Sequence, residues 1–213
     1  MDLHQVFADV PRVGEVDGCT YCYPQHELDL LGGDPALVPD DLVTSFAREV
    51  TDHWSEGQYG LLWRGLAPRI LAALEASPDE LLLHGLTFAH FSEWPRAEQD
   101  AVRAELRAMI ARAIDHQPPR HTHTLICAAA HADRDLTPWL DHLHTLPDPG
   151  VAALARYWAH DVGGGYEPTL WYFPEDPAAP IRAWLGSDAL RDRLARLGDA
   201  DTLIAIAEAL AEH

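Results

Sequence analysis

Two cysteines separated by two residues form the most chemically specific pattern in this sequence. Gly18 stands directly before Cys19, and Cys22 completes the Cys-x-x-Cys pair. A glycine in this position lets the backbone turn tightly, so that both thiolates can face one ion. Zinc prefers a tetrahedron of Cys and His ligands, and this pair supplies only half of that set. The pattern therefore predicts a zinc site that histidines from elsewhere in the chain complete.

The histidines that complete this site are selected by their positions in the chain. His26 follows shortly after Cys22, and His53 lies at the end of the first expected helix. Asp17 and Asp52 are carboxylate alternatives near the same positions. An ion held by such groups would fasten the N-terminal residues to the helical body and contribute folding free energy. We expect these side chains to hold a structural Zn²⁺: Cys19, Cys22, His53 and His26.

Two other interpretations of the cysteine pair stay open. One is thiol redox chemistry, but a thioredoxin-type pair follows a strand and opens a helix, and no strand is expected before Cys19. The acidic surroundings also favour a raised thiol pKa rather than a lowered one. The other interpretation is a reduced pair with no special role. The third cysteine, Cys127, stands among apolar residues and is expected to be a small buried side chain.

The chain has 13 histidines, and two pairs of them have the spacing His-x-His. His121 and His123 fall in a loop or at a helix entry, whereas His142 and His144 are expected on a helix. On a strand such a pair shares one face, but on a helix the two side chains lie about 200° apart. The first pair is therefore a candidate for chelation, with surface or capping roles as the alternative for both pairs.

A run of three glycines at residues 163–165 marks the longest irregular loop. It lacks the Lys and Ser/Thr of a phosphate-binding loop, so a flexible connection is the simpler interpretation. Titratable groups nevertheless gather on both sides of the glycines, which makes the loop a secondary candidate site. These groups are His160, Asp161, Tyr166 and Glu167.

The sequence carries 34 acidic and 15 basic residues, which gives a formal net charge of −19, and every basic residue is arginine. The absence of lysine excludes Walker-type, kinase-type and Schiff-base lysine chemistry. We expect no nucleic-acid partner, because such binding depends on cations that neutralise phosphates. An acidic surface instead favours a protein partner with a basic surface.

Targeting signals are not evident. Residues 1–10 lack the basic start and the apolar core of a secretory signal. No stretch approaches 18 uninterrupted apolar residues, so we expect no membrane span and no membrane partner. An odd number of cysteines does not indicate a secreted disulfide framework. These features together favour a cytoplasmic protein.

Apolar residues recur at helical spacing from residue 40 onward, and almost no strand pattern is present. We expect an all-α fold with helices near residues 40–54, 59–76, 78–93, 95–114, 149–160 and 199–212. Successive helices with short breaks indicate either an irregular HEAT-like array of antiparallel hairpins or a single orthogonal helical bundle. Residues 1–39 are expected to form an irregular arm that carries the Cys-x-x-Cys pair, and residues 40–213 a single helical domain.

The sequence shows no catalytic constellation, neither His-Glu-x-x-His nor Gly-x-Ser-x-Gly. We therefore favour a non-enzymatic, acidic, helical binding or adaptor protein with a structural zinc site in its N-terminal arm. The alternative is a metal-dependent enzyme that uses histidine and carboxylate ligands. The oligomeric state is left open.

Overall fold

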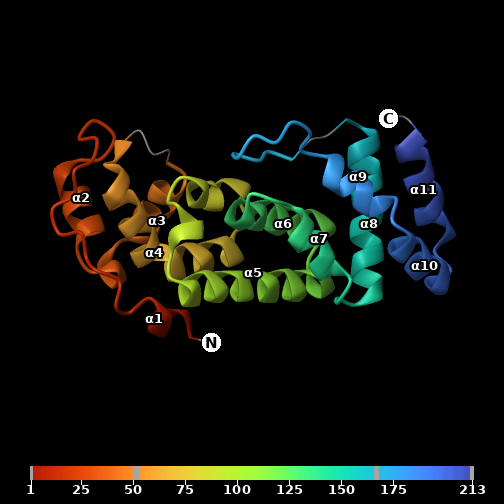
Figure 1. Cartoon of the computed structure of the whole chain (residues 1–213), viewed down its shortest axis with the longest axis horizontal. Coiled ribbons are helices and arrows are strands. Elements are labelled where there is room, and N and C mark those ends of the chain that lie inside the picture. The colour runs from red at the N-terminus through yellow and green to blue at the C-terminus, as the bar shows by residue number, and fades with distance from the viewer. Residues whose placement is uncertain (1, 50–52, 166–167, 212–213) are drawn as a thin grey trace. The chain divides into compact units, whose positions relative to one another are not determined.

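The computed structural model describes residues 2–49, 53–165 and 168–211, and the chain is all-α (Figure 1). Within these ranges the one β-type pairing is an isolated antiparallel bridge between Gly18 and Trp54. The all-α expectation is thereby confirmed, while the finer expectation of a HEAT-like array stays a prediction. None of the helices in these ranges combines the length and the apolar character that crossing a bilayer requires.

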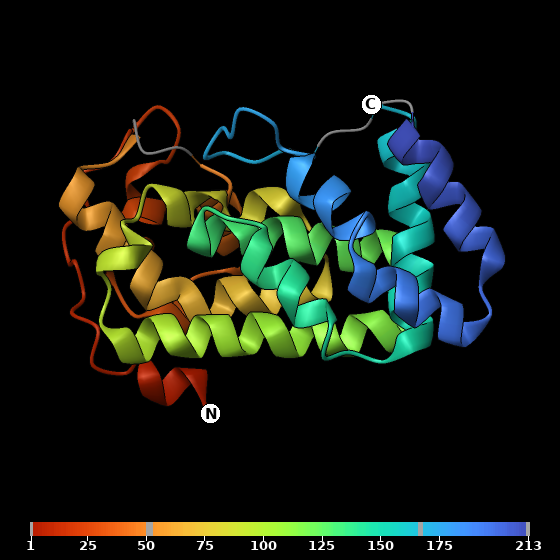
Figure 2. The ribbon, with the colours of Figure 1, turned by 45° about the vertical axis from the view of Figure 1, so that its right-hand side comes forward.

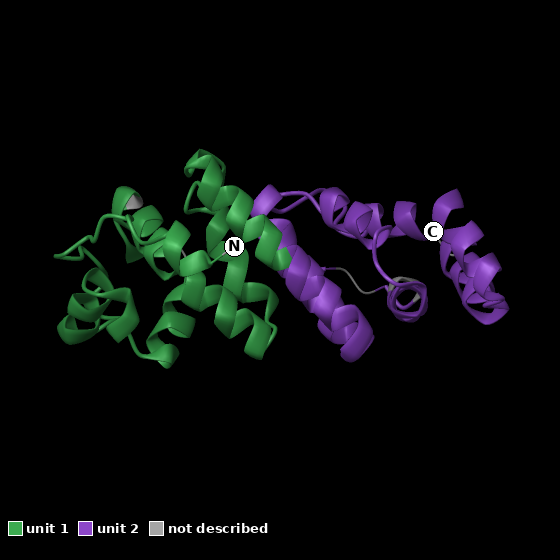
Figure 3. Cartoon of the chain, turned by 90° about the horizontal axis from the view of Figure 1, so that it is seen from below, with its two compact units in different colours: residues 1–106 green, residues 107–213 purple. Residues whose placement is uncertain are grey.

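The chain divides into two compact units (Figure 3). Unit 1 comprises residues 1–106 and unit 2 comprises residues 107–213. The division falls within α5 (Arg96–His116), so this helix contributes residues to both units. A domain boundary after residue 39, which the sequence suggests, stays a prediction.

Unit 1 is organised around α4 (Glu56–Ala76), against which α3 (Asp40–Ala47) packs. Both helices contact the 3-10 helix η3 (Glu80–Thr87). Three aromatic rings, those of Phe46, Tyr59 and Trp63, pack together in this core and are almost completely buried. The remaining elements are α1 (Leu3–Val6), α2 (Gln25–Gly32), η1 (Pro35–Leu37) and η4 (Phe91–Glu93).

The expectation of an irregular arm is wrong for α2. This helix has an acidic first turn at Glu27 and buries Leu28 and Leu31, which lie one turn apart. Three leucines are too few to establish a helical period between Pro24 and the glycines at 32 and 33. Burial of Leu28 and Leu31 against the rest of unit 1 makes the short helix stable, because isolated helices of this length are marginal.

The expected helix over residues 78–93 is also wrong, since η3 and η4 are separate 3-10 helices. His90 between them adopts a left-handed conformation with φ of 51°, which no α-helix accommodates. Ser77 ends α4, and the carboxylate of Asp79 caps η3 by accepting from the N–H of Leu81. Pro68 lies inside α4, and the helix continues past it.

Unit 2 is centred on α8 (Asp148–Gly163), which contacts α6 (Pro119–Asp133), α9 (Ala179–Leu185), α10 (Asp188–Leu197) and α11 (Ala200–Ala211). The last of these helices runs beside α8, as two views show (Figures 1 and 2). The short helix α7 (Thr137–Leu143) packs on α6. Ser187 caps the start of α10, and its hydroxyl accepts from the N–H of Leu190.

Candidate metal centre

The two cysteines lie at the ends of one tight turn. The carbonyl of Cys19 accepts hydrogen bonds from the N–H of Cys22 at 3.1 Å and from the N–H of Tyr23 at 3.0 Å. Gly18 is required here because neighbouring side chains lie too close to its Cα to leave room for a Cβ, and not because of its backbone conformation. A Cβ at this position would lie 2.7 Å from Leu28 and 3.0 Å from the ring of Trp54. The turn is therefore held against the body of unit 1 at its first residue.

His53 reaches the turn because its own backbone pairs with it. The N–H of Cys19 donates to the carbonyl of His53 at 2.9 Å, next to the bridge between Gly18 and Trp54. The indole of Trp54 packs on the rings of Tyr23 and Phe46, with centroid distances of 5.0 and 5.2 Å. This apolar packing fixes the residue that follows His53, and so it fixes where the imidazole can lie.

A side chain of α4 holds the residues that precede the turn. The amide of Gln58 accepts from the N–H of Asp17 at 2.8 Å and donates to the carbonyl of Glu15 at 3.0 Å. One residue of α4 thereby provides hydrogen-bond partners for the N–H of Asp17 and for the carbonyl of Glu15. The Cys-x-x-Cys turn is therefore positioned by two independent sets of hydrogen bonds within unit 1.

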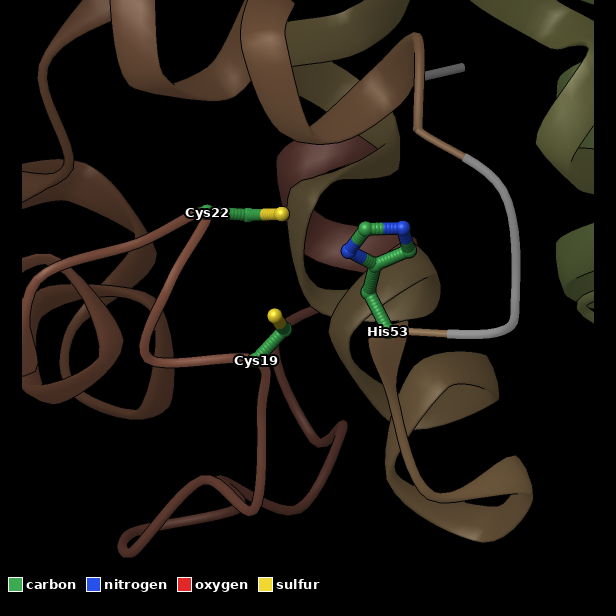
Figure 4. A group of neighbouring side chains, drawn as sticks. All are labelled: Cys19, Cys22 and His53. Carbon is green, nitrogen blue, oxygen red and sulfur yellow. The ribbon is translucent and has the colours of Figure 1, made fainter.

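The ligand atoms of Cys19, Cys22 and His53 all lie within 4.8 Å of one another. Figure 4 shows the two sulfur atoms and the imidazole turned toward one common space. Ligand atoms around a tetrahedral zinc lie about 3.5–4 Å apart, so small side-chain rotations would bring all three into bonding distance. The Nδ1 atom of His53 is buried and has no hydrogen-bond partner among the described residues, which suits a metal ligand.

The two thiols differ in their electrostatic surroundings. The backbone N–H of Cys22, then the side chain of Cys22 and the backbone N–H of Tyr21, lower the pKa of Cys19 by hydrogen bonding. Packing around the thiol, followed by its contact with Cys19, raises the pKa of Cys22. Without an ion, Cys19 therefore loses its proton at a lower pH than Cys22 does. Metal binding needs both thiolates, so binding would release any proton that the two thiols still carry.

The structure brings together three of the four expected ligands. His26 lies exposed on α2 and is not part of the group, so ligation by this residue stays a prediction. Asp17 contributes its backbone N–H to Gln58, as described above. Asp52 lies outside the described residues. Among those residues, no other carboxylate, imidazole or thiol joins the group within the same distance.

Neither His-x-His pair of unit 2 brings its two imidazoles into one group of candidate metal ligands among the described residues. His121 and His123 both lie on α6, where their spacing directs them to different faces. His142 lies on α7 as expected, and His144 is the residue at the end of that helix. His160 and Asp161 lie near the end of α8, whereas Tyr166 and Glu167, the other members of the loop candidate, lie outside the described residues.

One buried polar grouping in unit 2 was not foreseen. The indole N–H of Trp158 on α8 donates to Nδ1 of His123 at 2.8 Å. The sulfur of Cys127, one turn further along α6, lies 3.7 and 3.8 Å from the two ring nitrogens. Cys127 is fully buried, as expected, and His123 is 2% exposed. The spacing of four residues between these two side chains was the only signal in the sequence for this contact.

Burial lowers the pKa of His123 to about 4, with a smaller opposing effect of Asp161. An unfolded histidine titrates near pH 6.5, so between about pH 4 and 6.5 the unfolded chain binds more protons than the folded chain. Stability therefore rises with pH across this window. Acidification from about pH 7.5 to about pH 4.5 is expected to cost about 2–3 kcal/mol through this residue alone.

The measurement is urea unfolding of metal-free protein at both pH values, for the wild type and for His123→Gln. Glutamine can still accept from Trp158 but does not titrate, so its pH-dependent loss should be smaller by about 2 kcal/mol. His116→Gln, at an exposed position of α5, is the matched control and should follow the wild type. Equal pH dependence in all three proteins would contradict the assignment.

The fold and the site together define a class: an all-α protein of two compact units, with a cysteine–histidine group in the first. Comparison with protein-family models, with curated proteins and with solved structures found no match for this chain. The function is therefore argued from the site and the charge alone.

Proposed function

We propose that this chain is a non-enzymatic helical binding protein whose N-terminal residues are clipped to its body by a zinc ion. The observation that carries the proposal is the convergence of Cys19, Cys22 and His53, whose ligand atoms lie within 4.8 Å of one another. Two thiolates and an imidazole are the donor set that zinc prefers. The ion would then link the turn before α2 to the residues just before α4, which are distant in sequence but adjacent in unit 1.

A binding role is supported by the excess of carboxylates over arginines and by the pairing of several arginines within the chain. Of the 15 arginines, several are already paired with carboxylates, including half-buried Arg64 with buried Glu98 and buried Arg193 with Asp148. The acids outnumber them by 34 to 15, so many carboxylates have no cation of this chain to neutralise them. A protein with a basic surface would be attracted to these excess carboxylates, whereas nucleic acid would be repelled by them.

A metal-dependent enzyme is the second candidate, and one observation favours it. Cys22 is exposed, and the described residues supply three ligand atoms, which is the number that catalytic zinc sites draw from the protein. A water molecule in the fourth position would then be available for chemistry. The two candidates differ in the fourth ligand, so that ligand is what the experiment must identify.

The test is elemental analysis of untagged protein purified without chelator, followed by X-ray absorption at the zinc edge. We expect about one equivalent of zinc, lost in the Cys22→Ser variant and retained in Cys127→Ala, whose sulfur lies in unit 2. Four protein ligands would support the structural role, and three with an oxygen of water would favour the enzyme. Less than about a tenth of an equivalent in the wild type would contradict the zinc site altogether.

The binding role is tested separately by affinity capture from the source cells at low and at high salt. Basic proteins that are retained at low salt and lost at high salt support it, because exposed charge pairs are screened. Capture that is indifferent to salt, or that selects acidic proteins, would contradict charge complementarity as its basis.

A further inference from the structure

The exposure of the two thiols differs, and this difference bears on their oxidation. Cys22 is exposed, whereas Cys19 is half-buried behind it. A small oxidant therefore reaches the sulfur of Cys22 first. The remaining cysteine, Cys127, is fully buried in unit 2 and is out of reach of such a reagent. In the zinc-bound state both sulfurs would be thiolates, so exposure decides between them, and Cys22 is the first of the three cysteines that an oxidant would reach.

The second sulfur is already in place to complete the reaction. The turn between the cysteines is closed by the hydrogen bond from the N–H of Cys22 to the carbonyl of Cys19, at 3.1 Å. Residues three apart across such a turn have Cα atoms less than about 7 Å apart, which is within the range of disulfides. The two ligand atoms lie within 4.8 Å, and both sulfurs face the same space (Figure 4). Disulfide formation therefore needs side-chain rotation and little movement of the backbone.

We infer that Cys22 is an oxidation site for hydroperoxides and that its oxidation converts the zinc-binding pair into a Cys19–Cys22 disulfide, which releases the ion. This inference rests on the proposed zinc site. It adds a modification and a class of co-reactant to that site. It also makes the link that the ion forms between the turn and the residues before α4 reversible.

The reaction balances in two steps. The thiolate of Cys22 attacks one oxygen of the peroxide, the O–O bond breaks, and the leaving hydroxide takes a proton and becomes water, which leaves a sulfenic acid on Cys22. The thiolate of Cys19 then attacks the sulfur of Cys22, and the displaced hydroxide takes a second proton. In total, two thiolates, one hydrogen peroxide and two protons give one disulfide and two waters. Zinc dissociates because a disulfide sulfur is no longer a thiolate ligand.

The backbone contacts that position the turn do not depend on the sulfurs. The hydrogen bond from Cys19 to His53 and the two bonds to Gln58 involve only backbone groups and the Gln58 amide. They remain available in the oxidised protein. The disulfide therefore forms in place, and a dithiol reductant together with zinc should restore the original state.

The experiment treats zinc-loaded, full-length protein with hydrogen peroxide and follows zinc with a chromogenic chelator. The expected result is loss of about 90% of the zinc, a mass lower by two hydrogens, and a single disulfide between Cys19 and Cys22 on peptide mapping. Reduction with dithiothreitol and added zinc should restore zinc binding. Cys127→Ala should behave as the wild type does.

Two variants separate the failure of this inference from the failure of the zinc site. The zinc content before oxidation tests the site, and its absence there overturns the proposed function. His53→Ala removes a metal ligand but neither sulfur, so it should still form the disulfide when oxidised. Zinc that is retained after oxidation, or a Cys22 that proceeds to sulfinic acid with Cys19 still reduced, would overturn the inference while leaving the zinc site intact.

Discussion

Removal of zinc is expected to lower the melting temperature of the wild-type protein by about 10 °C. A ligand present at about a thousand times its dissociation constant stabilises the folded state by about 4 kcal/mol, and about 2–4 °C per kcal/mol is usual at this chain length. The physical reason is that the three ligands come together only in the folded chain, so binding free energy becomes folding free energy.

The measurement is calorimetry of the zinc-loaded protein with and without a chelator. A Cys19→Ser/Cys22→Ser variant should melt at the same temperature in both conditions, close to the chelated wild type. In Cys127→Ala the buried position itself is altered, so only its response to chelator is compared, and that response should equal the wild-type response. A wild-type melting temperature that ignores the chelator would contradict a structural role for the metal.

The second large effect is expected in unit 2, at Arg193. This side chain is 6% exposed and donates to the carbonyl of Leu143 at 2.9 Å, to the carbonyl of Leu146 and to the carboxylate of Asp148. A residue of α10 thereby donates hydrogen bonds to acceptors in and beside the segment that connects α7 to α8. Replacement by alanine leaves the two buried carbonyls, those of Leu143 and Leu146, without this donor, which is expected to cost about 3–5 kcal/mol of unfolding free energy.

The matched control is Arg191→Ala on the same helix. Arg191 pairs with Asp188 at 2.6 Å, but its side chain is 60% exposed, so its loss should cost less than about 1 kcal/mol. Urea unfolding followed by circular dichroism gives both values. Arg193→Lys, which keeps the charge but loses the planar fork, should fall between them and provides a measurement where the alanine variant does not fold. Equal losses at positions 191 and 193 would show that burial does not govern the effect.

Long amphipathic segments could be predicted well from the sequence. The expected helices at 95–114 and 199–212 correspond to α5 and α11, because several turns of apolar spacing accumulate there. The segment 78–93 was misassigned because a run of leucines fits both an α-helix and a 3-10 helix. The choice between them depends on how Leu82, Leu83 and Leu86 pack in the core, which local spacing does not encode.

The candidate site could be predicted only in part, because some of its contacts have a local sequence pattern and others do not. Cys19 and Cys22 were found because two close cysteines are rare and their chemistry is specific. His53 was selected by its position at a helix end, and the backbone pairing that brings it to the turn is a long-range contact with no local signature. His26 was selected by proximity in sequence, but α2 begins at Gln25 and leaves its side chain exposed.

The ligands of the proposed site come from both sides of α2 and α3, so an ion in that site would close a ring of polypeptide from Cys22 to His53. Such a ring restricts the unfolded chain as a disulfide does, by about 4 kcal/mol for a loop of this length in the chain-entropy view. It also changes how force travels through the molecule. With the ion bound, tension applied at the N-terminus would pass from Cys19 directly to His53 and α4, and the helices inside the ring, α2, η1 and α3, would carry none of that load.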